Sequence, residues 1–149
     1  MKRISLRDER GAAVVEFAIV ATLFILIVFG VIELGILMYD KHVLTNASRE
    51  GARVGILMRV PRVSDNDIQD IIKGYAEEHM VGFGPSSTLD FGPWPDEDPW
   101  IFPDEASRTG SLFGEELQVT VKYPFNFLVL SNFGLGPITL EAKTRMRME

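Results

Sequence analysis

The sequence predicts an α+β, bitopic protein. We expect a long N-terminal transmembrane helix that continues into a small head with one further helix and a short antiparallel sheet. Three observations predict this. A long uncharged segment lies near the N-terminus, an amphipathic stripe at helical spacing follows Ser64, and two segments of alternating polarity close the chain. A length of 149 residues suits one small domain plus an appendage.

The first element is a membrane helix at residues 12–39. The 16 residues from Phe17 to Ile32 carry no charge and leave no polar face. If Glu33 is tolerated, the apolar stretch reaches Tyr39, and about 20 residues already cross the hydrocarbon core. A cleaved secretory signal, the main rival, would have a shorter apolar region of about 7–15 residues and a small-residue cleavage site. We therefore predict a retained helix.

Residues 1–11 form a basic leader. Four basic and two acidic side chains give it a net charge of +2. A positive start favours a cytoplasmic N-terminus, with the rest of the chain outside the cytoplasm. Three basic residues just past the helix, Lys41, Arg49 and Arg53, make this charge bias less clean.

Glu16 is a carboxylate near the start of the apolar segment, where an acid is costly. In one interpretation its side chain extends to the lipid headgroups. In the other, the chain is cut between Gly11 and Ala12. Glu16 would then pair with the new α-amino group one helical turn away, or with that of a neighbouring subunit, and low dielectric would strengthen the pair.

Glu33 is the second acid of this segment. It lies 17 residues after Glu16, so the two carboxylates are separated by about 100° around the helix and cannot form one site within it. Glu33 either marks the outer membrane edge, with Tyr39 as interfacial aromatic, or is a polar contact between subunits that Gly30 and Gly35 assist.

We expect the helix to continue outside the membrane over residues 40–58, because the first proline is Pro61. Ala47, Gly51 and Gly55 recur every four residues. Small residues at this spacing let another backbone approach closely. The expected neighbour is the protein's own sheet, and the alternative is an intermolecular contact.

Residues 59–149 form the predicted extracytoplasmic head. Ser64 can cap a helix from Asp65 to about Met80, which Gly82 and Gly84 would end. Alternation predicts strands at residues 117–123 and 138–148, each with one face on the long helix and one in water. A weak strand is possible at 88–91. The mostly apolar segment 125–136 is read as a hairpin connection that touches the membrane or a partner.

An acidic loop rich in proline and glycine is predicted at residues 82–116. Trp94 and Trp100 would pack down onto the head or contact a partner. The run Asp96-Glu97-Asp98 raises the question of calcium, but its spacing fits no EF-hand loop. We therefore predict no metal.

Composition excludes several functions. The chain has no cysteine, so disulfides and thiol chemistry are excluded. A net charge of −6 argues against nucleic-acid binding. Its only two histidines have no metal-ligand spacing, and nucleophile and nucleotide motifs are missing from the sequence. We expect neither an enzyme nor a cofactor.

Residues 10–55 resemble a known family. A basic residue, Gly11, four small or apolar residues and then Glu16-Phe17 are similar to a type IV prepilin processing site. With Phe29-Gly30-x-x-Glu33-x-Gly35 and the run 45–53 (TNASREGAR), the segment resembles the TadE-like family of the tight-adherence, Flp-type pilus systems. Residues 138–148 resemble the family's closing strand, whereas residues 60–116 carry no usable resemblance.

The resemblance implies a minor pseudopilin with a pilin-like head, cut by a prepilin peptidase after Gly11 and held in the bacterial inner membrane. Its implied partners are the peptidase, other pseudopilins or pilin subunits, the inner-membrane assembly platform and the lipid bilayer. Asp8 and Glu9 depart from a purely basic leader. The alternatives are a permanently anchored binding module that uses its head, and a pseudopilin of the general secretion family.

Overall fold

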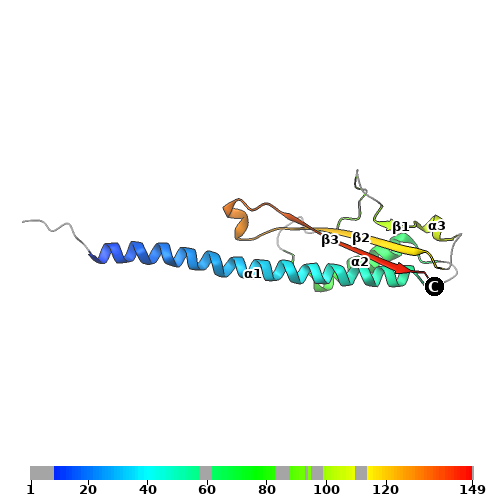
Figure 1. Ribbon diagram of the computed structural model, residues 1–149, viewed down its shortest axis with the longest axis horizontal. Helices are drawn as coiled ribbons and strands as arrows, with labels where there is room; N and C mark the ends of the chain where they lie inside the picture. The colour runs from blue at the N-terminus through cyan, green and yellow to red at the C-terminus, as the bar shows by residue number, and fades with distance from the viewer. Residues whose placement is uncertain are drawn as a thin grey trace, which may run out of the picture.

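The computed structural model describes residues 9–57, 62–82, 88–92, 94, 99–109 and 114–148, with residues 9, 10 and 109 described as backbone only. The long helix α1 (Glu9–Gly55) runs without a break through the predicted membrane segment and into the head. Figure 1 shows α1 as a rod whose C-terminal half carries the head while its N-terminal half projects beyond it. The predicted α+β class is confirmed.

The helix α2 (Asp65–His79) lies beside the C-terminal half of α1. The Ser64 side chain caps it by accepting a hydrogen bond from the Asp67 amide at 3.1 Å, as predicted. Ile68, Ile72 and Ala76 form its buried stripe. The helix therefore turns one apolar face inward and leaves most of its acids in water, while Asp65 at its start pairs with the buried Arg108.

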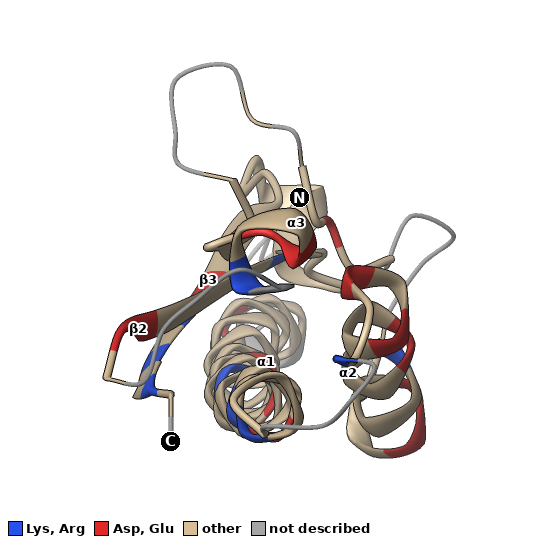
Figure 2. Ribbon diagram, turned by 90° about the vertical axis from the view of Figure 1, so that its right-hand side faces the viewer, with Lys and Arg blue, Asp and Glu red and all other residues tan. Residues whose placement is uncertain are grey.

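The sheet has three antiparallel strands in the order β1 (Ile101–Phe102), β2 (Glu116–Phe125) and β3 (Ile138–Arg147). The hairpin of β2 and β3 pairs along its whole length, from Glu116 with Arg147 to Phe125 with Ile138. The end-on view in Figure 2 places α1 between the hairpin on one side and α2 on the other. Helix α1 therefore packs on the hairpin, and α2 packs along α1.

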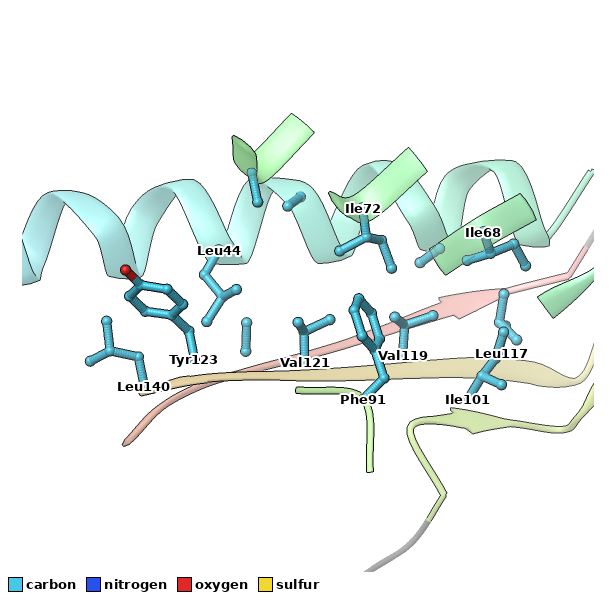
Figure 3. Close-up of a cluster of buried hydrophobic side chains, with 14 of the residues drawn as sticks. Leu44, Ile68, Ile72, Phe91, Ile101, Leu117, Val119, Val121, Tyr123 and Leu140 are labelled. Carbon is cyan, nitrogen blue, oxygen red and sulfur yellow. The ribbon is translucent and has the colours of Figure 1, made fainter. Parts of the chain in front are cut away.

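The core lies between the helices and the inner face of the sheet (Figure 3). Leu44 of α1 and Ile68 and Ile72 of α2 have no exposed surface. They face alternate residues of β2, namely Leu117, Val119, Val121 and Tyr123. The prediction that this face of the strand is buried is therefore confirmed. A sheet this small needs helices to complete its core.

The outer face of β2 differs from the prediction. Gln118 and Thr120 were expected in water, but their exposed fractions are only 8% and 4%. β2 is the central strand, and the Arg145 side chain on β3 donates a hydrogen bond to the Gln118 side chain at 3.0 Å. A central position and a cross-strand partner therefore remove these polar groups from solvent.

The segment 82–116 also holds more structure than the predicted loop. It contributes β1 and the short helix α3 (Glu105–Thr109). The weak strand predicted at 88–91 is instead an isolated bridge between Asp90 and Lys122. The calcium candidates Asp96, Glu97 and Asp98, most of the leader and Gly84 lie outside the described residues.

Candidate functional site

The N-terminal half of α1 exposes apolar side chains on all sides. Phe17 is 73% exposed and Phe24 is 65% exposed. Its most apolar window of 18 residues has a mean hydropathy of 2.8, and none of that window is buried. In water, such a surface would be strongly unfavourable. By length and composition, α1 fits a single-pass membrane anchor.

The residues of the predicted processing site lie on this projecting half. Gly11, Ala12, Glu16 and Phe17 are all exposed and helical. A Cβ added to Gly11 would meet no atom within 4 Å. The surface around Glu16 is thus left open by the head.

Glu33 lies where the head begins, and its surroundings differ completely from those of Glu16. It is 3% exposed. Its carboxylate accepts hydrogen bonds from three consecutive backbone amides of the connection between β2 and β3. Leu128 donates at 2.8 Å, Leu130 at 3.1 Å, and Val129 through a short contact. Charge-assisted bonds of this type are the stronger class of hydrogen bond.

This contact revises both interpretations of Glu33. The carboxylate is buried rather than open to solvent, and its oxygens accept hydrogen bonds within the chain, which neither interpretation included. Local sequence patterns could not reveal this contact, because the donors lie about 95 residues away along the chain. The one sequence signal for such a contact is that residues 123–140, like residues 17–32 of the helix, carry no charged side chain.

The β2–β3 connection contains the short helix η1 (Leu130–Phe133), which packs on α1. A Cβ added to Gly30 would meet Leu130 at 3.9 Å, so Gly30 lies directly under η1, whereas Gly35 faces open space. Further along the hairpin, the Lys41 ammonium donates to the backbone carbonyl of Glu141. Glu33 and Lys41 therefore hold the hairpin to α1 by polar contacts at two successive levels, and Ser48 adds a third further along the helix.

The small residues of α1 are buried in the head. Ala47 has no exposed surface, and Ser48 shares a 2.6 Å hydrogen bond with Thr144 on β3. A Cβ on Gly51 would lie 2.5 Å from Ile72 of α2, and one on Gly55 would lie 2.5 Å from Leu117 of β2. The expected neighbour, the protein's own sheet, is found at Gly55 and Ser48. At Gly51 the structure corrects the expectation, because α2 occupies the space there.

Asp40 follows the predicted membrane segment and is fully buried. Its Oδ1 accepts a hydrogen bond from the Val81 amide at 2.9 Å, just after α2. Its Oδ2 has no hydrogen-bond partner among the described residues. Asp40 thus ties the end of α2 to α1.

Both tryptophans of the segment 82–116 contact their own chain. The Trp94 indole donates to Asp90 at 3.0 Å, and the Lys122 ammonium lies 4.4 Å from the centre of its ring. Trp100 meets Phe91 edge to face, with ring centres 5.2 Å apart. These contacts show packing onto the head.

Within the described ranges, no group of three or more His, Asp or Glu residues could hold a metal ion. The features that stand out are instead an exposed apolar helix and a head fixed to it. Together they fit a protein with a single-pass membrane anchor and a small α+β head.

Most of α1 matches a known protein family. The family model described as TadE-like protein matches residues 11–53. The resemblance predicted from the sequence is thereby confirmed over this segment, and it points to a role in Tad/Flp pilus assembly. Neither the curated proteins nor the solved structures provide a significant match to the chain.

Proposed function

We propose that this protein is a minor pseudopilin, or another component of tight-adherence pilus assembly, that a prepilin peptidase cuts after Gly11. In this proposal α1 anchors it in the bacterial inner membrane, with the N-terminus in the cytoplasm and the head outside. Its function is structural: it presents a subunit to other pseudopilins or pilins and to the assembly platform.

The observation that carries the proposal is the projecting half of α1. This half is mostly apolar and exposed, its first turns project beyond the head, and it bears one exposed acid, Glu16. The family match begins at Gly11, the residue after which the cut is proposed. A helix that ends in a new amine beside Glu16 would suit alignment against the next subunit.

The direct test is the intact mass and N-terminal sequence of the protein purified from its own host. Cleavage gives a chain of 138 residues that begins at Ala12, with a formal side-chain charge of −8 because a leader of charge +2 is lost. The Gly11→Val variant should keep Met1. Gly35→Val is the matched control, because both glycines are exposed on α1 with no atom near an added Cβ.

A second test concerns Glu16. Glu16→Gln should leave membrane insertion and cleavage intact and impair assembly, because the neutral amide cannot pair with the Ala12 amine. Glu78→Gln, an exposed change on α2, should assemble normally. Normal assembly of Glu16→Gln would remove the pairing idea, while an uncut wild-type chain would favour a permanently anchored binding module.

A further inference from the structure

The connection between β2 and β3 ends in an apolar surface that the head does not cover. We call residues 128–135 the hairpin tip. Leu128 is 58% exposed, Phe133 62% and Leu135 47%, and the adjoining Ile138 is 43% exposed. Apolar side chains gathered in this way at the end of a loop usually mark an interaction site.

The hairpin tip lies against the membrane segment of α1. In Figure 1 the orange η1 lies beside α1, toward its N-terminus from the rest of the sheet. Phe133 closes one side of an apolar groove of about 490 Å³. The rest of the groove is formed by α1 residues Val15, Ala18, Ile19, Thr22, Leu23 and Leu26. The tip and the membrane segment therefore share one continuous apolar surface.

Charged residues mark the level at which this surface begins. Lys41 of α1 donates to the backbone carbonyl of Glu141 on β3, and Glu141 lies opposite Lys122 in the register of β2 and β3. We call these three residues the charge collar. Between Lys122 and Glu141 the chain has 18 residues without a charge. Between Phe17 and Lys41 the only charged residues are Glu33 and Asp40, and both are buried.

The dimensions fit a bilayer. Gly11 and Lys41 are 30 residues apart, about 45 Å along the helix, against roughly 40–45 Å for a bilayer with its headgroups. Gly30, under the tip, is 11 residues from the collar, or about 16 Å. A collar at the lipid surface therefore places the tip well below the headgroups.

The backbone of the tip is prepared for such surroundings. Glu33 accepts the amides of Leu128, Val129 and Leu130. The amides of Asn132, Gly134 and Leu135 donate to carbonyls within the tip. Water would satisfy these groups in an aqueous loop, whereas the bilayer interior requires partners from the protein.

We propose that the hairpin tip inserts into the lipid leaflet that faces the head, as a second membrane element beside α1, with Glu33 satisfying its backbone. The occupant of the apolar surface is lipid acyl chain. The proposal rests on α1 crossing the membrane and is independent of cleavage at Gly11.

Three phenylalanines of similar exposure allow a matched test. Phe24 is 65% exposed on α1, Phe133 62% on the tip and Phe102 59% on β1 of the head. The chain has no cysteine, so Phe24→Cys, Phe133→Cys and Phe102→Cys each give one labelling site. Each full-length variant would carry an environment-sensitive fluorophore in liposomes of phosphatidylethanolamine and phosphatidylglycerol.

We expect doxyl groups on the lipid chains to quench the labels at positions 24 and 133 several-fold more than the label at 102. Aqueous iodide should quench the label at 102 most. A label at 133 that iodide quenches like the label at 102, while the label at 24 responds to lipid, overturns the proposal. Protection at 133 from both quenchers also overturns it and indicates a protein partner or a second copy.

If the label at 24 also fails to respond to lipid, α1 does not cross the membrane, and the proposal fails together with its premise. A fourth variant guards against a local effect of the label. Leu135→Cys, on the same exposed surface, should respond as Phe133→Cys does. Cleavage at Gly11, scored separately by mass, decides the proposed function without reference to this result.

Discussion

The two halves of α1 are one continuous helix in two different surroundings. From Gly11 to Ile32 most side chains are apolar and exposed, and they include large ones such as Phe17 and Phe24. From Asp40 to Gly55, one face carries small buried residues and the other carries exposed charges such as Arg49 and Arg53. The comparison teaches that residue size decides where a helix can pack closely in the head, while charge decides where it can meet water.

The largest contrast is expected for one substitution made in each half. Leu44→Ala removes a fully buried side chain and should lower the free energy of unfolding of the head by about 2–5 kcal/mol. Leu23→Ala, at a residue 58% exposed, should leave it almost unchanged. Urea unfolding in detergent micelles, followed by tryptophan fluorescence, measures both. Equal losses would mean that the N-terminal half contributes to the folded core.

Glu33 lies between the halves, and its removal should separate them. Glu33→Ala leaves three backbone amides without their acceptor, at a cost of roughly 1–3 kcal/mol. Hydrogen exchange should accelerate at residues 128–130 and remain unchanged in α2. Glu16→Ala is the control, since its exposed carboxylate has no contact with the head among the described residues. Unchanged exchange in Glu33→Ala would contradict the role given to this carboxylate.

The close packing of α1 on α2 gives a smaller effect. Gly51→Ala places a methyl group 2.5 Å from Ile72, and the resulting strain should lower the free energy of unfolding by about 1–3 kcal/mol. The higher helix propensity of alanine should offset up to about 1 kcal/mol of this loss. Gly74→Ala, in α2 with open space around it, should instead gain stability. Thermal unfolding of the two variants measures the difference. A gain in both would show that the helices separate without cost.

The smallest effect concerns pH and is confined to the head. Hydrogen bonds from the Trp94 indole and the Gly92 amide, with the nearby charge of Lys122, hold the pKa of Asp90 below its ordinary value of 3.8. The resulting stability is present above pH 3.8 and is lost as pH falls through the lower pKa of the folded state. Unfolding midpoints of wild type and Asp90→Asn should therefore converge below pH 3.8. A constant difference would exclude this linkage.

Local signals were enough to predict most of the fold. The continuous helix follows from the uncharged segment and the late first proline, and α2 follows from Ser64 and its apolar spacing. The inner face of β2 follows from alternation. Burial of Gln118 could not be foreseen in the same way, because it depends on a third strand and on Arg145 from β3.

The candidate site was predictable only in part. Gly11 and Glu16 lie in a local motif, so the sequence could point to them directly. Glu33 was noticed as an unusual acid, but its three donors come from the far end of the chain. The neighbour of Gly51 was also wrongly chosen, because small-residue spacing predicts close approach without naming the element that approaches.

The unbroken course of α1 has a consequence for direction. The described helix contains no proline from Glu9 to Gly55, so it offers no joint at which the head could swivel relative to the anchor. Glu16 and Gly51 are 35 residues apart, so their positions around the helix axis differ by about 100°. A neighbouring subunit that binds the Glu16 face of the helix would therefore also fix the direction in which α2 points around the helix axis.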